Sequence, residues 1–265
     1  MWAAGMRPVP APAFLAELPA DAERARAAGA DALEFPGDFC AVDESYGTAT
    51  WQAAAKVLEA AGLRATVHLP FVWVDLAALD REVWEGSVRS VERAAEAMAP
   101  LQPALAAVHP ANYATQSLLT AAPQSARPMA MMALADRVVA AVKRLRAGPL
   151  GAVIGLENLE GLPLELFQVV AEQADAHVCF DFGHALSDGV DPVAAFATLR
   201  DRVVGVHLHD AKRGRAHLAL GQGDLDLAAV RPSLEGLPVV LELEQEAEDS
   251  LQKLLSTRST SSSSL

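Results

Sequence analysis

Two kinds of segment alternate along the chain. Long segments rich in Ala, Leu, Glu and Arg carry apolar residues at helical spacing, and short runs of apolar and β-branched residues separate them. The expected helices are 14–28, 46–61, 80–98, 129–147, 162–174, 191–201, 224–235 and 246–255. The expected strands are 31–35, 64–69, 105–109, 152–157, 177–181, 203–209 and 238–244. Because this alternation is typical of a parallel sheet covered by helices, we predict an α/β fold, a (β/α)8 TIM barrel, with residues 1–255 as a single domain.

The two ends of the chain depart from this pattern. A barrel of eight strands needs a strand near 6–13, where Pro8, Pro10 and Pro12 cannot donate hydrogen bonds to a neighbouring strand. We therefore expect the first strand to be short, irregular or missing. Residues 256–265 are mostly Ser and Thr, and we expect a disordered tail there.

Composition narrows the classes of partner and compartment. The chain has 34 acidic and 21 basic residues, a formal net charge of −13, which argues against binding nucleic acid. The two cysteines, Cys40 and Cys179, form no disulfide framework and suit a reducing compartment, so we expect a cytoplasmic protein. Residues 97–126 lack charged side chains, but four prolines interrupt them, so no membrane span is expected.

Ionisable side chains gather at one end of the expected strands. Eight of them lie at or next to a carboxyl end: His68, His109, Glu157, Asp181, His184, His207, His209 and Glu242. Catalytic groups of TIM barrels lie at this end. Because successive strand residues point to opposite faces, His207 should share a face with Gly205, opposite Val204 and Val206. The polar set is therefore expected to point into the barrel and the apolar set toward the helices.

Carboxylates and imidazoles that converge in this way would leave buried charge unpaired unless a ligand binds them. A divalent cation is the simplest such ligand, and the mixed donor set suits Mn, Zn, Co or Fe better than Ca. For any one of these histidines alone, a hydrogen-bonded structural role is the alternative. We expect His177, at the amino end of its strand, and Cys179 to have structural roles.

The loop after strand 203–209 holds a second candidate feature. Arg213 could pair with a substrate oxyanion or phosphate, and a solvated loop charge is the alternative. Gly221 and Gly223 would let backbone N–H groups approach an anion, since this region of TIM barrels often binds phosphate. A plain turn before the next helix is the alternative for these glycines.

Taken in order, these residues resemble the xylose isomerase-like TIM barrels, a superfamily that includes endonuclease IV and many sugar-phosphate isomerases and epimerases. The matching motifs are Val-His68-Leu-Pro, Val-His109-Pro-Ala-Asn, Leu-Glu157-Asn, Phe-Asp181-Phe-Gly-His184-Ala, His207-Leu-His-Asp, His217-Leu-Ala-Leu-Gly-Gln-Gly and Leu-Glu242. Each motif is short, and it is their joint order and spacing, from about residue 30 to residue 244, that carries the resemblance.

For the epimerases of this superfamily, the resemblance implies roles by position. Glu157, Asp181, His207 and Glu242 match the four ligands of the metal ion. The two glutamates among them also match the carboxylates that move protons. His184 matches a histidine that contacts the substrate, and Arg213 matches a substrate-contacting arginine.

Two other branches imply different roles. In the endonuclease branch, His68, His109 and His217 match further ligands of a trinuclear zinc centre, but Arg215 stands where that branch has an aspartate. The chain also resembles cobamide-remodelling hydrolases, which split a phosphodiester in the nucleotide loop of a corrinoid. The segments Thr66–Pro70 and Ala99–Pro103, the irregular first strand and His209 support this second resemblance.

Three functions therefore stand as hypotheses. The first is a divalent-metal-dependent sugar or sugar-phosphate isomerase or epimerase, with Glu157 and Glu242 as the catalytic carboxylates. The second is a metal-dependent phosphodiester hydrolase with a larger metal site. The third is a non-catalytic ligand-binding barrel. The expected partner is a small sugar or phosphorylated ligand, and a homo-oligomer remains open.

Overall fold

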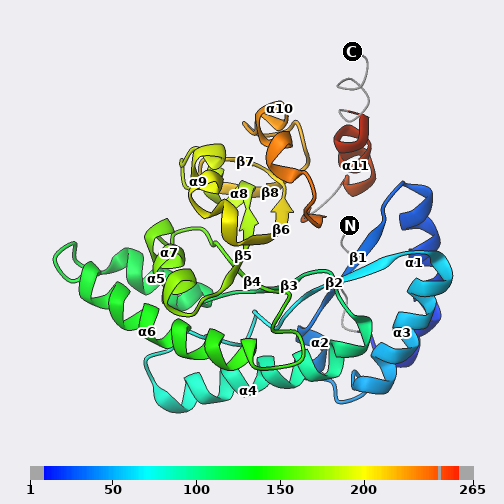
Figure 1. Ribbon diagram of the computed structural model, residues 1–265, viewed down its shortest axis with the longest axis horizontal. Helices are drawn as coiled ribbons and strands as arrows, with labels where there is room; N and C mark the ends of the chain where they lie inside the picture. Colours follow the sequence, from blue (N-terminus) through cyan, green and yellow to red (C-terminus); the bar gives the residue numbers. More distant parts are fainter. Residues whose placement is uncertain (1–8, 244–245, 257–265) are drawn as a thin grey trace.

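A computed structural model describes residues 9–243 and 246–256. Seven parallel strands form a nearly closed barrel in the order β1-β2-β3-β4-β5-β6-β9, with helices on the outside (Figure 1). The strands are β1 (Ala32–Pro36), β2 (Arg64–His68), β3 (Ala106–Val108), β4 (Ile154–Glu157), β5 (His177–Asp181), β6 (Val203–Leu208) and β9 (Val239–Leu241). Every strand expected from 31 to 244 is present, so the TIM barrel prediction is confirmed.

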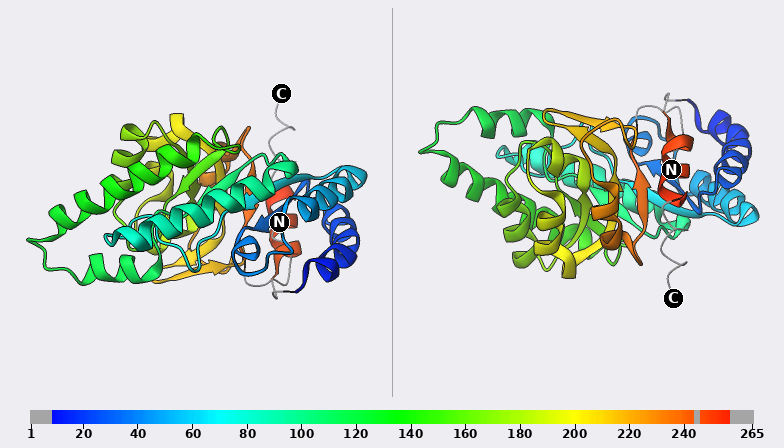
Figure 2. Two further views of the ribbon diagram at one scale, coloured as in Figure 1. Left: turned by 90° about the horizontal axis from the view of Figure 1, so that it is seen from below. Right: turned by 90° about the horizontal axis from the view of Figure 1, so that it is seen from above.

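The longer helices lie close to the segments that the spacing of apolar residues predicts. They are α1 (Ala11–Ala27), α2 (Asp38–Val42), α3 (Thr48–Ala61), α4 (Arg81–Met98), α5 (Tyr113–Ala121), α6 (Arg127–Arg146), α7 (Leu164–Gln173), α8 (Phe182–Ser187), α9 (Pro192–Leu199), α10 (Leu227–Val230) and α11 (Ala247–Ser256). Asp80 and Asp191 cap α4 and α9 by accepting two backbone N–H groups each, which defines where these helices begin. Helices α5 and α6 extend beyond the barrel at one end of the molecule (Figure 2).

The barrel does not close between β1 and β9. Of the segment expected to form the first strand, residues 6–8 lie outside the described residues, Val9 and Pro10 are irregular, and α1 begins at Ala11. No strand within residues 9–243 and 246–256 pairs with the outer edge of β1 or β9. The two edges border a cavity of about 170 Å³, which Leu251 and Leu254 of α11 also line. Helix α11 (red) lies between α1 (blue) and the strands in both views of Figure 2.

Small apolar side chains fill the barrel interior. Leu105, Ala107, Cys179 and Val240 form a separate buried cluster, as strand alternation and the packing role expected for Cys179 predict. A Cβ atom on Gly205 would lie 2.6 Å from Leu105 Cδ2, so a glycine there makes room for that leucine. One face assignment was wrong. Val204 packs against this interior cluster rather than under the helices, because the pairing of β5 with β6 shifts register near Val178.

The segment after β6 is not a simple loop. It forms an antiparallel hairpin of β7 (Asp210–Lys212) and β8 (Arg215–Leu218), which the sequence pattern did not predict. Gly214, with φ of 74°, makes the tight turn between the two strands. None of the described helices is both long and apolar enough to cross a membrane.

Candidate metal centre

The carboxyl ends of five strands bring the predicted polar residues to one place. His68 ends β2, Glu157 ends β4, Asp181 ends β5, His207 lies near the end of β6 and Glu242 directly follows β9. The register of β5 and β6 sets Asp181 opposite His207. All five are buried, with 0 to 6% of their surface exposed. Parallel pairing thus assembles side chains from positions up to 174 residues apart (68 to 242) into one cluster.

Glu157 lies at the centre of the cluster. Its Oε2 atom is 3.2 Å from His68 Nε2 and 3.3 Å from His109 Nε2. Its Oε1 atom is 3.1 Å from His207 Nδ1 and 3.6 Å from His184 Nδ1. One carboxylate therefore contacts imidazoles from four different strand ends. His207 Nδ1 is also 3.0 Å from Glu242 Oε1, so it faces two carboxylates.

Several of these buried atoms are close together without forming aligned hydrogen bonds. Among the described residues, both carboxylate oxygens of Glu157, Asp181 Oδ2, Glu242 Oε1 and His207 Nδ1 lack a hydrogen-bond partner. An unsatisfied polar atom in the interior is costly, and the five atoms belong to two neighbouring groups of potential ligands that share Glu157. Carboxylate oxygens and imidazole nitrogens are the ligands that Mn, Fe, Co and Zn share. The residues present therefore fit a divalent cation.

The potential ligands fall into three groups whose members lie within 4.8 Å of one another. The groups are His68, Glu157, His207 and Glu242; Glu157, Asp181 and His184; and His184, His209 and His217. Glu157 belongs to the first two groups and His184 to the last two. Of the four ligands implied by the epimerases, three lie in the first group with His68, and Asp181 lies in the second.

Backbone carbonyl groups orient three of the histidines. The Nδ1 atoms of His68 and His184 are each 2.9 Å from a carbonyl oxygen, that of Leu69 and that of Asn158, and His217 Nδ1 is 3.3 Å from the carbonyl oxygen of Glu242. Each contact places the proton of a neutral ring on Nδ1. The Nε2 atoms of these rings then face the cluster and the pocket, and that of His68 is 3.1 Å from His109 Nε2.

The charges of the cluster are mutually dependent. Burial opposes ionisation of Glu157, but His207 and His109 outweigh it and hold the Glu157 pKa well below its ordinary value. Burial likewise opposes ionisation of Glu242, and His207 lowers the Glu242 pKa to about 2. Burial would lower the pKa of His68, but Glu157 raises it to about 9. The metal-free cluster thus keeps its carboxylates ionised and favours protons on His68 and His207, which a cation would displace, whereas burial lowers the pKa of His109.

His209 belongs to the third group of potential ligands and also supports the cluster through its contacts. Its Nδ1 atom accepts the backbone N–H of His217 at 2.9 Å, so the proton of the neutral ring is on Nε2, 3.1 Å from Asp181 Oδ1. Its ring stacks on the ring of His217, with centroids 4.3 Å apart. A Cβ atom on Gly183 would lie 2.0 Å from the His209 ring, so only glycine leaves room for it. His209 therefore ties the β7–β8 hairpin to Asp181.

Asp210 fixes the loop that follows. Its buried carboxylate accepts the backbone N–H groups of Ala211, Gly221 and Leu225 at 2.8 to 2.9 Å. A Cβ atom on Gly223 would lie 2.1 Å from Asp210 Oδ1. The two glycines thus serve the packing around Asp210, and the Gly221 N–H that we expected to meet an anion is already bonded.

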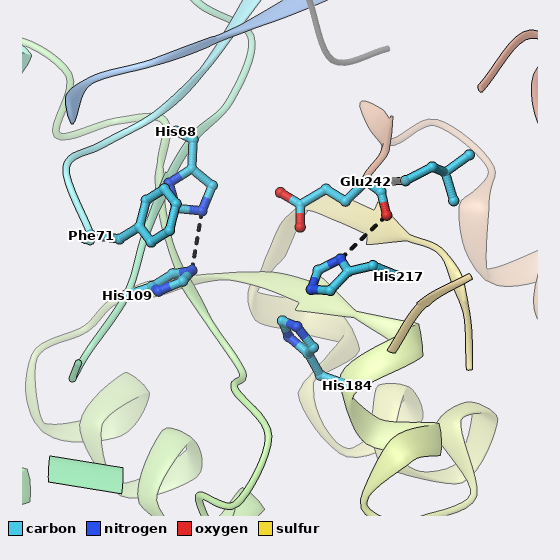
Figure 3. Close-up of a pocket in the computed structure, with 7 residues that line it drawn as sticks. His68, Phe71, His109, His184, His217 and Glu242 are labelled. Carbon is cyan, nitrogen blue, oxygen red and sulfur yellow. Dashed lines mark hydrogen bonds between the residues drawn. The ribbon is translucent and has the colours of Figure 1, made fainter. Parts of the chain in front are cut away.

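A pocket of about 280 Å³ opens above the cluster. Figure 3 shows His68 and His109 on one side of it and His184 and His217 on the other, with Glu242 between them. Among the described residues, Arg213 does not line this pocket: it is exposed in the turn of the β7–β8 hairpin. Phe71 also lines the pocket, with its ring 4.5 Å from the His68 ring and 4.8 Å from the His109 ring.

Sequence reasoning missed Glu34, which lies on β1 and is 2% exposed. Its Oε1 atom is 3.6 Å from His207 Nε2, on the opposite side of the ring from Glu157. A carboxylate in this place orients a histidine whose Nδ1 binds a metal. The signal was present, because Glu34 is a single charge inside the apolar run Ala-Leu-Glu-Phe-Pro. Asn158 is a second support, and its side chain bonds both the N–H and the carbonyl of Asp181.

The family model described as "Xylose isomerase-like TIM barrel" matches residues 22–259, so the chain belongs to this family. Among solved structures, 3-keto-D-glucoside 4-epimerase from E. coli has a TM-score of 0.71 and 17% identity, covering 91% of this chain and 94% of the other. Endonuclease IV from Thermus thermophilus has a TM-score of 0.64 and 23% identity, covering 97% and 96%. These two similarities show the fold alone.

A third structure is more similar in sequence. The TTHB071 protein from Thermus thermophilus, whose crystals were soaked with ZnCl2, has 25% identity and a TM-score of 0.65, and the match covers 91% of this chain and 94% of the other. No curated protein matches the chain. The solved structures with a similar fold include ones described as sugar epimerases and endonuclease IV.

Proposed function

We propose that the protein is a divalent-metal-dependent hydrolase that splits a phosphodiester in a small-molecule substrate and uses more than one metal ion. The observation that carries this proposal is the position of Glu157. One of its oxygens faces His68 and His109, and the other faces His207. A carboxylate with potential ligands on both sides would be shared by neighbouring ions, and paired ions would stabilise the attacking and leaving oxygens in phosphoester hydrolysis. Among the described residues, the ligand group around Glu157, His207 and Glu242 includes His68 but not His109, so a site for one ion gives His109 no ligand role.

The ligand groups and the contacts of Glu157 indicate how residues would be shared between ions. His68, Glu157, His207 and Glu242 form one group and would hold one ion, and Asp181 and His184 form a second group with Glu157. His109, 3.3 Å from Glu157 Oε2, would add a ligand to a neighbouring ion. Ions bound there would neutralise the negative charge that develops on a phosphodiester during hydrolysis and lower the pKa of a water nucleophile. His184 and His217 present Nε2 atoms at the pocket, where they can accept a proton or bind a phosphate oxygen.

The choice of a small substrate rests on charge. The net charge of −13 opposes binding to a nucleic acid, whose affinity depends on cationic contacts to phosphates. The pocket, at about 280 Å³, suits part of a small molecule. The nucleotide loop of a corrinoid, which the sequence resemblance implies, contains a phosphodiester of this class.

A sugar isomerase or epimerase is the second candidate. Glu157 and Glu242 both contact His207 Nδ1, at 3.1 and 3.0 Å, so two carboxylates are available near one ion to remove and return a proton. Several neighbouring folds are those of sugar epimerases. Against this candidate, Arg213, the expected substrate contact, is outside the pocket lining of the described residues.

Metal analysis combined with two assays tests these candidates. The full chain is purified and loaded separately with Mn, Zn, Co and Fe, and its metal content, hydrolysis of bis(p-nitrophenyl) phosphate and epimerisation of ketohexoses are measured. We expect about two or three ions per chain and release of p-nitrophenol. Glu157→Gln should abolish both, whereas Glu165→Gln, at an exposed position of α7, should change neither.

Two results would overturn the hydrolase proposal. A single ion per chain together with epimerisation of a sugar would establish the second candidate. A folded protein that takes up no metal and turns over no substrate would leave the non-catalytic barrel. Thermal unfolding of Glu157→Gln shows whether that variant is still folded.

A further inference from the structure

We propose that the protein forms a homodimer through an apolar face on the side of the barrel that carries α5. Within residues 9–243 and 246–256, nine large apolar side chains are exposed, and seven of them lie on this side. They belong to the loop between β2 and α4, the first turn of α4, α5 and the first two turns of α6: Val72, Trp73, Leu79, Val83, Tyr113, Met129 and Met132. These seven residues are called the apolar face. The inference is independent of the reaction at the metal centre.

Contacts between the elements join the apolar face into one surface. The hydroxyl of Thr115 on α5 donates to the carboxylate of Asp75 in the loop between β2 and α4. Arg137 on α6 donates to the carbonyl oxygen of Leu79 at 2.9 Å, and its own carbonyl oxygen accepts Trp84 Nε1 at 3.2 Å. In both views of Figure 2, α5 and the start of α6 project from the barrel at the same end. The exposed side chains therefore lie on neighbouring elements that are bonded to one another.

The size of the apolar face suits a specific protein interface. Trp73 is 77% exposed and Tyr113 is 83% exposed, so these two side chains offer roughly 300 Å² of aromatic surface. The other five enlarge this area toward the ~800 Å² that each partner contributes to a stable interface. Monomeric proteins rarely expose a contiguous apolar patch of more than a few hundred Å². Aromatic and methionine side chains are also the types that are enriched in interfaces.

Charge favours a second copy of the chain as the partner. The formal net charge of −13 makes two copies repel each other wherever acidic surfaces meet. Residues 97–126, which include α5, carry no Asp, Glu, Lys or Arg. Beside the apolar face, opposite charges are neighbours in sequence, Arg81 with Glu82 and Asp136 with Arg137. A two-fold axis brings a surface against itself, so that surface must be self-complementary. An uncharged centre with balanced charges beside it meets this condition.

Sedimentation of the full chain at about 1–100 μM tests the inference. The wild type should sediment with twice the mass of one chain. Met132→Glu and Trp73→Glu, on separate elements, should each raise the dissociation constant of the dimer about 10-fold or more, because like charges then meet across the interface. Val190→Glu is the matched control: Val190 is 42% exposed between α8 and α9, outside the apolar face, so the dimer should persist.

Thermal unfolding shows that each variant is folded, and Tyr113→Glu replaces a face variant that does not unfold cooperatively. Three results would overturn the inference. One is a wild type that has the mass of one chain at every concentration. Another is a dimer that the face variants leave intact, which places the interface elsewhere. The third is a monomer that floats with phosphatidylcholine vesicles and loses this association in Trp73→Glu, which assigns the apolar face to a lipid surface. None of these results depends on metal uptake or hydrolysis, so failure of the dimer and failure of the proposed function are distinguishable.

Discussion

The completely buried residues beneath the pocket and the partly exposed histidines around it belong to the same centre but differ in their surroundings. Glu157, Asp181 and His207 are completely buried, at 0% exposure, and each lies on a central strand of the barrel. His109 and His217 are partly exposed, and each lies on a loop or hairpin that follows a strand. The lower layer is thus fixed by strand pairing, and the upper layer by contacts that loops make.

This difference indicates that the lower layer serves metal retention and the upper layer serves ligand exchange. Buried carboxylates whose oxygens lack aligned hydrogen bonds would hold a bound cation throughout turnover, because leaving them unpaired is costly. The pocket histidines are oriented by carbonyl groups and reach the solvent, so they can exchange a ligand during turnover. Substitutions in the two layers should therefore differ in their effect on metal retention and on turnover.

The largest effect is expected from the lower layer. Glu157→Gln removes the charge that contacts His68, His109 and His207, so metal content should fall to near zero and kcat/KM should fall by about 10²–10⁴-fold. Elemental analysis and initial rates measure the two quantities. If the variant kept its full metal content, Glu157 would not be the shared ligand, and the two layers would be independent.

A smaller effect is expected from the upper layer. His109→Gln should remove one ion and lower kcat/KM about 10–100-fold, because His109 contacts Glu157 but lies outside the group of His68, Glu157, His207 and Glu242, whose ion remains. Metal titration by calorimetry should show one fewer binding event. Loss of all metal in this variant would mean that the layers bind cooperatively rather than separately.

The connection between the layers can be weakened without touching a ligand. Gly183→Ala places a Cβ atom in the His209 ring, which must then leave Asp181 and the backbone of His217. We expect metal affinity to fall about 10-fold or more, as for a residue that orients a ligand. Gly86→Ala on α4 is the control, because its Cβ meets nothing within 4 Å. Equal metal affinities in the two variants would contradict the support role of His209.

The smallest effect concerns stability without metal. The pKa of His68 is raised from 6.5 to about 9 by Glu157, so its contribution to stability is complete below pH 6.5 and is lost as the pH rises through 9. The Tm of the metal-stripped protein should therefore exceed that of stripped His68→Gln at pH 6, and the difference should narrow at pH 9. A constant difference between these pH values would show that the charge of His68 does not stabilise the fold.

The same contrast explains which parts of the fold and of the candidate site could be predicted from the sequence. Strand periodicity and the position of polar residues at strand ends predicted the barrel and brought Glu157, Asp181, His207 and Glu242 to one end. The β7–β8 hairpin was missed because its strands are short and follow a strand directly. The packing of His209 on Gly183 was not visible in the sequence, since it depends on how two strand ends face each other in space. Glu34 was visible as an isolated charge but had no partner until the strands were placed.

The opening between β1 and β9 has a consequence for the choice of ion. Within the part of the chain that the structure describes, Glu242 follows a strand that is paired on one side only, whereas Glu157 lies on β4 between two neighbours. Side-chain packing of α11 closes that side of the barrel, and such packing adapts more readily than a ladder of hydrogen bonds. We expect Glu242 to shift with the ionic radius of the bound metal while Glu157 stays in place. Such a barrel would accept cations of different size, and cellular supply would then decide which one it carries.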